Sequence, residues 1–512
     1  MNKILQIIRN ILKSNKFFIF ILIFFFIESA WIAVSAAYPQ AFDEDFHFGI
    51  INIYTSHLNP FLRSQPINGD RFGALARDPS YLYQYLLNFP LRITKLFTKD
   101  ILIQVYVLRF INIGLAVSAL VIFSKVLRRA KISKTMINLI LFLFVLIPIV
   151  PQLAGQINYD NLLLPLIAWV LLISFDLLDQ IKKYKIKART LLSLIIICSL
   201  ASLVKFVFLP IFATIFMFMV IYIYIKHKKR AKKLWLSFIE SFRKETLYIR
   251  IVLVSLLFIS VGMFIQRDGV NLLKYHTVEP NCSQVISKSE CKSYGPWEYN
   301  YVSHSDLLNS KAHGYNPIRG IFYFANQWLY WMWFRLFFAI NGPDNSFANY
   351  PPLPLPSAAA LGIFGISILL FLRYIKVFFK DNLRLFLLFA ISIIYLLALF
   401  IQGFISYRYT NVLENMNGRY LLPVIIPLAG VLSVGFSLFF KKFNRLKVLV
   451  ALILIFLFIQ GGGFLTFIDR SDDTWDVPNS VIRQFNNKAR HITNPVIING
   501  NKYYYTYTWF FN

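Results

Sequence analysis

The residues best suited to chemistry gather in a short acidic run at positions 41–50. Asp43, Glu44 and Asp45 are adjacent, and His47 follows two positions later. A carboxylate near an acceptor hydroxyl can take its proton as the oxygen attacks, which is general base catalysis. Structural roles explain part of the run, because an Asp N-cap and acids in the first helical turn favour a helix start. Capping explains one acid well and a second adequately, but it gives His47 no role.

Two further elements place polar residues near apolar stretches. The run 77–87 begins with Arg77 and Asp78 and continues with aromatic residues, which predicts an interfacial helix. An aromatic belt with a helix-starting proline is the simpler reading, and Arg77 then touches lipid. The turn 155–161 adds Asp160, for which a helix cap is an equal alternative.

Isolated cations suit a leaving phosphate, whose developing negative charge needs positive partners in a low-dielectric site. Lys205 is the strongest candidate, because a charge flanked by apolar residues at a tight turn is costly without a partner. The other candidates on the same side are Arg419, Arg77 and, less strongly, Arg408. Arg109 lies inside an apolar run, where we expect it to pair with a backbone carbonyl or with Glu28.

The chain that carries these residues has 512 residues, of which 57% are hydrophobic and 15% charged. A soluble domain is about 25% charged. Several nearly uncharged stretches reach the length of about 20 residues needed to cross a bilayer, without the alternation of barrel strands. The composition therefore predicts an all-α polytopic membrane protein and excludes secreted enzymes, cytosolic enzymes and nucleic-acid-binding modules. We expect about eleven spans, near 17–37, 101–124, 136–150, 161–179, 191–204, 206–225, 250–266, 357–373, 384–404, 420–440 and 447–467.

The basic residues sort the loops into two sides. More than half of the 53 Lys and Arg residues fall in short alternate loops, and such loops stay cytoplasmic. The N-terminus is therefore predicted inside, and the segments 38–100 and 267–356 outside. The basic residues that give the net charge of +29 thus set the topology and face anionic lipid headgroups. We expect 1–467 to form a transmembrane catalytic module in the cell membrane with an extracytoplasmic active site, and 468–512 to form a short outer tail.

Two segments decide this topology. The apolar run 191–225 is too long for one span, so we expect a tight helical hairpin with Lys205 at its outer turn. One long tilted helix would invert everything downstream. The basic N-terminus and the residues 33–37 resemble a cleavable signal peptide. The apolar run between them is long and Glu28 interrupts it, which favours a retained signal anchor.

The long outer loop and the tail carry three further patterns. Cys282 and Cys291 lie in the outer loop, where an oxidising compartment allows a disulfide. The aromatic run 322–340 predicts a helix lying against the membrane. Residues 496–511 predict a β-hairpin with a type I′ turn. The sequence contains no metal-ligand spacing of cysteines and no glycine-rich nucleotide-binding loop.

The acidic run Phe42-Asp43-Glu44-Asp45-Phe46-His47-Phe48-Gly49 looks like the first-loop motif of the GT-C superfamily of integral-membrane glycosyltransferases. The similar patterns are Asp-Glu-x-x-His-Phe in bacterial polytopic members and Phe-Asp-Glu-x-His-Phe-Gly in protein O-mannosyltransferases. Against the mannosyltransferase pattern this sequence has one extra residue before His47.

Three later segments extend the resemblance. The segment 78–83 resembles a Pro-Pro-Leu-Tyr-like stretch, with Ser80 in place of the second proline. The turn 157–161 is similar to the family's Asn-x-Asp turn, and 418–423 looks like a Gly-Arg-Tyr-x-x-Pro element that opens a late span. The four motifs occur in the family's order on one face of the membrane over residues 17–440.

The resemblance implies an inverting transfer of a sugar from a polyprenyl-phosphate donor to a hydroxyl of a glycan, lipid or protein at the outer face. It assigns Asp43 as the general base, Glu44 as its acidic companion and Asp160 as a second carboxylate. The donor phosphate is expected to bind Lys205, Arg419 and Arg77. The supporting residues are His47, Asp78 and Tyr420. Whether Asp43 and Asp160 hold a divalent metal is left open, because metal dependence varies across the superfamily.

Two other classes fit the composition. A multi-pass transporter or lipid flippase usually has related halves with interrupted helices at matching positions, and the sequence shows no convincing similarity between halves. A lipid-linked glycan polymerase or ligase also has many spans and a large outer loop. Such an enzyme does not need a carboxylate cluster directly after its first span.

Overall fold

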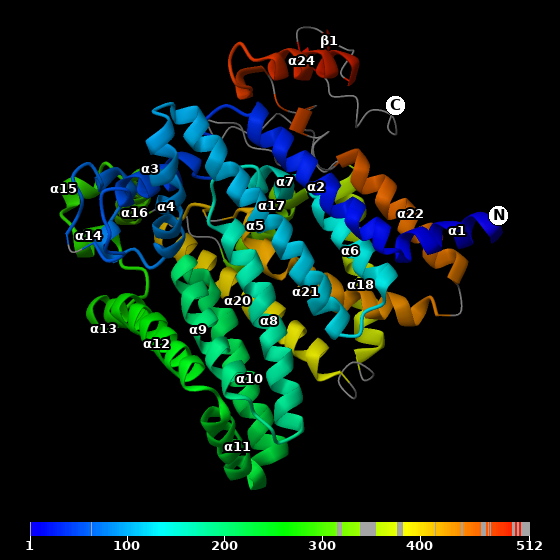
Figure 1. The fold of residues 1–512 in the computed structure, drawn as a ribbon. Coiled ribbons are helices and arrows are strands. Elements are labelled where there is room, and N and C mark those ends of the chain that lie inside the picture. Colours follow the sequence, from blue (N-terminus) through cyan, green and yellow to red (C-terminus); the bar gives the residue numbers. More distant parts are fainter. Residues whose placement is uncertain are drawn as a thin grey trace.

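Helices dominate the computed structural model of the chain (Figure 1). The apolar helices are α2 (Asn15–Ser35), α5 (Ile101–Arg129), α6 (Lys134–Val145), α8 (Asp160–Lys182), α9 (Ala188–Val204), α10 (Leu209–His227), α12 (Leu247–Phe264), α18 (Leu355–Arg373), α20 (Leu383–Thr410), α21 (Leu422–Phe439) and α22 (Asn444–Gly461). The structure describes residues 2–62, 64–314, 320–337, 355–375, 382–414, 416–441, 444–461, 467–468, 471, 473–493, 497–498 and 501–502.

Hydropathy and length confirm the prediction of an all-α polytopic membrane protein. Within the described residues, 7 helices are long and apolar enough to cross a membrane. They are Asn15–Ser35, Ile101–Arg129, Asp160–Lys182, Phe206–Lys244, Leu247–Tyr275, Leu383–Thr410 and Gly418–Phe439. The expected count of about eleven is not confirmed, because four expected spans coincide with shorter apolar helices. These are Lys134–Val145, Ala188–Val204, Leu361–Arg373 and Leu446–Phe456.

The core of the bundle is built on α5, which packs against α2 and α8, while α8 packs against α9. The short helix α7 (Ile149–Ala154) leans on α2, and Gly155 follows it. A Cβ at Gly155 would lie 2.8 Å from the backbone oxygen of Ser29, so only glycine permits this approach. The close packing fixes the turn after Gly155 beside the C-terminal part of α2.

The apolar run 191–225 divides at Lys205, as predicted. Helix α9 ends at Val204, the 3₁₀ turn η3 (Phe206–Phe208) follows, and α10 starts at Leu209 with Pro210 in its first turn. Pro210 suits this position because the first helical N–H groups have no partner in the helix. Lys205 therefore sits at the turn between two apolar helices.

The first long loop contains two helices, and the second of them overlaps the interfacial helix predicted in the run 77–87. These are α3 (Glu44–Tyr54) and α4 (Leu82–Phe97), which pack together. The single turns η1 (Asp70–Phe72) and η2 (Leu75–Arg77) lie between them. In Figure 1 this group lies at the left, beside the helices of the second long loop.

The second long loop begins with a π-helical turn, η5 (Ile265–Gly269), and holds four short helices before α17. They are α13 (Val270–Tyr275), α14 (Cys282–Val285), α15 (Lys288–Cys291) and α16 (Gly295–Ala312). A disulfide joins Cys282 to Cys291, so the pairing that the sequence allowed is present. The expected aromatic helix is α17 (Ile321–Phe337), which packs on α20; residues 338–340 lie outside the described residues.

The tail docks on the C-terminal end of the first span. Ala36 forms an isolated β-bridge with Asp476, and Trp475 packs with Ile32 and Phe467. Helix α24 (Val481–Thr493) follows, and Arg490 donates to Asp476 at 2.7 Å. Strands β1 (Ile497–Ile498) and β2 (Asn501–Lys502) pair antiparallel, as expected of a hairpin; residues 503–511 lie outside the described residues.

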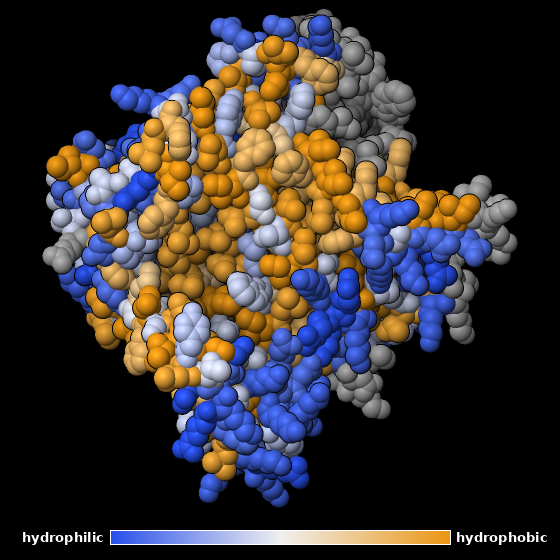
Figure 2. All heavy atoms as spheres, in the orientation of Figure 1, coloured by the Kyte–Doolittle hydropathy of each residue, from blue (hydrophilic) through white to orange (hydrophobic). Residues whose placement is uncertain are grey.

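The surface separates by hydropathy in one view. Figure 2 shows a broad hydrophobic band across the centre and hydrophilic residues gathered at the lower end, where α10 meets α11 (Ala231–Lys244). A band of this kind is what a bilayer covers, and the basic helix α11 lies beyond its lower edge. The terminal helix α1 (Asn2–Lys13) projects at the right in Figure 1.

Candidate active site

Asp43 stands at the start of α3 in a strained backbone conformation. Its φ of 70° and ψ of 27° are left-handed, and the preceding Phe42 also has a positive φ of 62°. Such conformations are costly for residues other than glycine and collect at functional sites. Asp43 occupies the N-cap position but makes no side-chain capping bond. The capping explanation of this acid is therefore wrong.

The Asp43 carboxylate instead pairs with Arg419, which lies in the turn η6 (Gly418–Leu421). Arg419 Nη2 donates to Asp43 Oδ2 at 2.6 Å, and its Nη1 donates to the backbone oxygen of Phe42 at 3.0 Å. The Asp43 side chain is 48% exposed and that of Arg419 only 6%. Burial works against the charged form of Asp43, but the charges of Arg419 and, less strongly, Lys205 outweigh it and lower its pKa. Asp43 is thus an ionised carboxylate at an open position.

Glu44 lies in a closed network behind Asp43. Its two oxygens accept from Arg109 Nε at 2.8 Å and Nη2 at 2.6 Å, and both side chains are 0% exposed. The backbone N–H groups of Gln40 and Ile157 also donate to Glu44. Arg109 further donates to the backbone oxygens of Ala33, Ala36 and Ala37. The expected carbonyl partners of Arg109 are present, but the acid it binds is Glu44, where Glu28 was expected.

A second ion pair joins Asp160 to Lys205. Lys205 Nζ donates to Asp160 Oδ1 at 2.7 Å, and both side chains are buried. The same ammonium lies 4.2 Å from the ring centre of Tyr159 and 5.0 Å from that of Tyr420. Asp160 Oδ2 is buried and has no hydrogen-bond partner within the described part of the chain. One oxygen of Asp160 thus holds Lys205, and the other keeps its capacity to accept.

The ring of Tyr420 links the two ion pairs. Its centre is 5.4 Å from Arg419 Cζ and 5.0 Å from Lys205 Nζ. Cations over aromatic faces are stabilised when they are shielded from water. Asn158 links the two segments that carry the carboxylates, because its side chain donates to the Phe42 carbonyl and accepts from the backbone N–H of Asp160. Asp43, Asp160, Lys205 and Arg419 therefore share one site.

His47 faces the same site from the first turns of α3. Its ring lies 4.6 Å from that of Tyr159, and its Nδ1 lies 3.2 Å from the side-chain amide of Gln84. Burial lowers the pKa of His47 to about 3, so the ring is neutral. Its buried Nε2 has no partner among the residues that the structure describes. A neutral imidazole with one unengaged nitrogen can hydrogen-bond a substrate hydroxyl.

The structure places Arg77 and Asp78 in a cluster beside this site, together with Arg267 and Asn271. Arg267 is fully buried, donates to the Ala76 carbonyl and lies 4.7 Å from the ring centre of Tyr81. Asn271 donates to the Arg77 carbonyl at 2.9 Å. Burial raises the pKa of Asp78 although the Ser80 amide and Arg267 favour its charged form. The π-helical end of α12 thus clamps the segment that carries Arg77 and Asp78.

The segment 78–83, the second motif, reaches Lys205 through Ser80, whose hydroxyl accepts from the backbone N–H of Phe206 at 3.1 Å. All four segments singled out in the sequence therefore meet around Lys205 and Arg419. Arg408, the weaker cation candidate, is exposed near the end of α20. Within the described residues no group of three or more His, Cys, Asp and Glu side chains could hold a metal ion, and Asp43 and Asp160 each bind a cationic side chain.

A cavity of about 350 Å³ opens next to this site. Phe206, Pro210 and Tyr395 line it from η3, α10 and α20, and Glu279 lines it from the loop after α13. The hydroxyl of Tyr395 donates to the backbone oxygen of Tyr420 at 2.9 Å, so one wall of the cavity is shared with the site. A volume of this size accommodates a small-molecule ligand.

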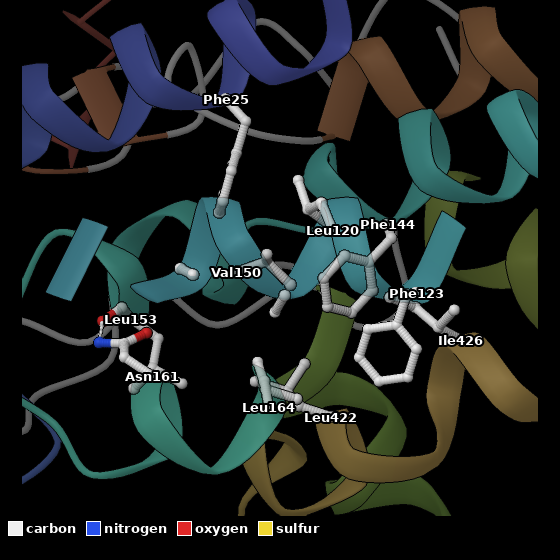
Figure 3. Close-up of a pocket in the computed structure, with 12 residues that line it drawn as sticks. Phe25, Leu120, Phe123, Phe144, Val150, Leu153, Asn161, Leu164, Leu422 and Ile426 are labelled. Atoms are coloured by element: carbon white, nitrogen blue, oxygen red, sulfur yellow. Dashed lines mark hydrogen bonds between the residues drawn. The ribbon is translucent and has the colours of Figure 1, made fainter. Parts of the chain in front are cut away.

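A second cavity lies within the helical core and has a different character. Its volume is only about 10 Å³ and its lining is mostly apolar, with Phe25, Phe123 and Leu164 from three helices (Figure 3). Asn161 is its polar member, and its amide donates to the backbone oxygens of Leu153 and Gln156. The volume is about that of one water, so this is a packing gap and not a substrate site.

Sequence reasoning missed several residues of the site. The Glu44–Arg109 pair spans 65 positions, and the sequence has no feature that connects them. Tyr159 and Asn158 lay inside a recognised motif but were not given roles. Glu279 lies in a loop without periodic pattern, and its only signal was the rarity of acids in the chain, which has 24 Asp and Glu in total.

Comparison with known proteins gives a structural likeness alone. No protein-family model and no curated protein matches the chain. Among solved structures, a match is the archaeal oligosaccharyltransferase AglB from Archaeoglobus fulgidus, determined in complex with an inhibitory peptide and a dolichol-phosphate. The two chains share 13% identity with a TM-score of 0.42, over 95% of this chain and 61% of that one. The chain thus spans less than two thirds of the protein that it matches.

Proposed function

We propose that the chain is an inverting glycosyltransferase that moves a sugar from a polyprenyl-phosphate donor to an acceptor hydroxyl at the outer face of the cell membrane. The observation that carries this proposal is the meeting of two carboxylates and two cations, Asp43, Asp160, Lys205 and Arg419, beside a cavity between apolar helices. Carboxylates suit the attacking hydroxyl, and the cations suit the leaving phosphate.

The chemistry follows from where the charges stand. The acceptor oxygen bonds to the anomeric carbon of the sugar as the bond between that carbon and the phosphate oxygen breaks. The hydroxyl proton passes to Asp43, and the electron pair of the broken bond leaves with the lipid phosphate. Lys205 and Arg419 stabilise the charge that the phosphate gains, which a water-poor site strengthens.

The ion pair between Asp43 and Arg419 suggests how the base is activated. A carboxylate whose pKa is lowered by a guanidinium is ionised but weakly basic. Donor phosphate binds the same guanidinium and competes with Asp43 for it. Arrival of the donor therefore weakens the ion pair and raises the basicity of Asp43 at the step that needs it.

The cavity between α10 and α20 supports a lipid-linked donor. Both helices belong to candidate membrane spans, and Leu209, Pro210 and Leu399 give the cavity apolar walls. Phe206 joins this lining to Lys205, the residue before it. An isoprenoid chain between α10 and α20 would place its phosphate at Lys205. Glu44 and Arg109 are proposed to position the loop that carries Asp43, because neither is exposed.

Sugar transfer by purified protein in nanodiscs tests the proposal. Wild type should release polyprenyl phosphate from at least one of a panel of polyprenyl-phosphate sugars when a hydroxyl acceptor is present. Asp43→Asn keeps the shape of the side chain but removes the basic carboxylate, so turnover should fall about 10²–10⁴-fold while donor binding persists. Asp45→Asn is the matched control, because Asp45 is an exposed neighbour that hydrogen-bonds Tyr38.

Asp45→Asn should turn over within about twofold of wild type. Near wild-type turnover in Asp43→Asn together with an inactive Asp160→Asn would assign the base to Asp160. No transfer from any donor, with ATP-independent movement of lipid between leaflets, would favour the flippase alternative. Chain growth from lipid-linked oligosaccharide would favour the polymerase or ligase alternative.

A further inference from the structure

The polar residues that line the cavity beside Lys205 have no role in the chemistry described above. The lining is apolar on α10, whereas Thr277, Glu279 and Gln402 bring a hydroxyl, a carboxylate and an amide to the same cavity. Glu279 is exposed to the cavity although protein surrounds it. A carboxylate in such a place is costly unless a ligand or a charged partner meets it.

The surroundings of Glu279 are acidic. Burial, and after it the charge of Asp78, raises the pKa of Glu279 to about 7. Burial and then the charges of Glu279, Asp78 and Asp43 raise the pKa of the Tyr294 phenol. Asp43, one of these three acids, faces the proposed reaction.

The cationic groups of the site adjoin this cavity. Lys205 Nζ and Arg419 Cζ lie 5.0 Å and 5.4 Å from the centre of the Tyr420 ring, where they suit the phosphate. Phe206 follows Lys205 and lines the same cavity as Glu279. A donor whose phosphate lies at Lys205 therefore has its attached groups at this cavity, where the apolar residues suit the lipid and Glu279, Thr277 and Gln402 suit the hydroxyls of the sugar.

We propose that Glu279 is the specificity-determining residue for the donor's sugar and that its carboxylate accepts hydrogen bonds from sugar hydroxyls. The inference rests on the proposed function. It favours donors whose sugar carries hydroxyls and no acidic group, because a uronic acid would bring a further carboxylate into surroundings where burial already disfavours the charged forms of Glu279 and Asp78. Paired like charges in a shielded site repel strongly.

Binding of three lipids separates sugar recognition from phosphate recognition. The probes are polyprenyl phosphate, polyprenyl-phosphate-glucose and polyprenyl-phosphate-glucuronic acid, titrated onto the full chain in nanodiscs. Wild type should bind the glucose lipid at least tenfold more tightly than the glucuronic acid lipid. Glu279→Gln should lose at least tenfold in affinity for the glucose lipid, as expected for a hydrogen bond to a charged acceptor. Its affinity for sugar-free polyprenyl phosphate should stay within about twofold.

Glu298→Gln is the matched control, since Glu298 is an exposed acid in the first turn of α16 in the same outer loop. It should leave all three affinities unchanged. Equal loss of sugar-free and sugar-bearing lipids in Glu279→Gln would overturn the inference, as would equal binding of the two sugar lipids by wild type. The wild-type comparison needs no variant and so survives a folding defect. Failure of wild type to bind polyprenyl phosphate at all would instead count against the proposed function.

Discussion

At the scale of single residues, exposure separates the acids that can react from those that build the site. Glu44, Asp160 and Asp43 all bind a cationic side chain, but only Asp43 is open, at 48% exposure. A buried ion pair holds segments together and has little freedom to exchange a proton. Asp43 is therefore the acid that can meet an acceptor, and Glu44 is the one that fixes its loop.

Glu44→Gln is expected to act on stability before it acts on catalysis. The substitution leaves the fully buried guanidinium of Arg109 without its counter-charge, and breaking a buried pair in this way costs about 3–5 kcal/mol. Thermal unfolding of the detergent-solubilised protein should therefore begin at a clearly lower temperature than in wild type. Asp45→Asn, one residue away and exposed, is the control. A Glu44→Gln protein of normal stability and no turnover would return Glu44 to the catalytic role that the family resemblance implies.

Lys205→Met is expected to weaken binding of the donor and to leave binding of the acceptor nearly unchanged. Loss of one charge-assisted contact to phosphate corresponds to about 1.5–3 kcal/mol, or roughly a tenfold to hundredfold increase in KM for the lipid donor. KM for the acceptor should change little. Arg408→Met is the matched control, because Arg408 is exposed near the end of α20. Unchanged donor dependence in both Lys205→Met and Arg419→Met would remove these residues from the phosphate site.

At the scale of elements, two short turns deliver the cations. Lys205 precedes η3 between α9 and α10, and Arg419 lies in η6 before α21. A single turn that opens an apolar helix holds its charged residue at the edge of the span, close to the segments that carry the carboxylates. The position of η6 depends on its packing against α17.

Gly418→Ala tests whether that packing sets the site. A Cβ at Gly418 would lie 2.3 Å from the backbone nitrogen of Leu336, so α17 and η6 must move apart. Because Arg419 is the next residue, donor affinity should fall although no charge is changed. Gly114→Ala in α5 is the control, because a Cβ there meets nothing within 4 Å. Normal donor affinity in Gly418→Ala would show that η6 tolerates the displacement.

The sequence predicted well those features that depend on a local pattern of residues. Apolar runs predicted the spans, and the charge at position 205 predicted the break between α9 and α10. The acidic run and the Gly-Arg-Tyr segment held the residues that meet as Asp43 and Arg419. Contacts between distant segments had no such signal. Nothing in the sequence showed that Arg109 pairs with Glu44 and not with Glu28, and Glu279 belonged to no recognised motif. The length of an apolar run also failed to predict the number of spans where the helix is short, as at Lys134–Val145.

At the scale of the whole molecule, the candidate active site and the most basic helix lie at different ends. The four charged residues of the site lie where α2, α8, α10 and α21 begin or end, together with the two long loops. The basic helix α11 connects the opposite ends of α10 and α12. A bilayer around the hydrophobic band in Figure 2 would leave these two ends on opposite sides. The distribution of basic residues then predicts that the basic end is cytoplasmic and that the site is outside.

Cysteine labelling tests this orientation with two matched substitutions. Lys232→Cys lies in α11 and Lys311→Cys in α16, and both lysines are exposed. The wild-type chain offers no background, because Cys198 is fully buried and Cys282 and Cys291 are bonded to each other. In intact cells a membrane-impermeant maleimide should label Lys311→Cys and should reach Lys232→Cys only after the membrane is permeabilised. The reverse pattern would place Asp43 and Lys205 on the cytoplasmic side, where an outer-face sugar transfer has no access to them. Labelling of both variants in intact cells would mean that α10 and α12 do not both cross the membrane.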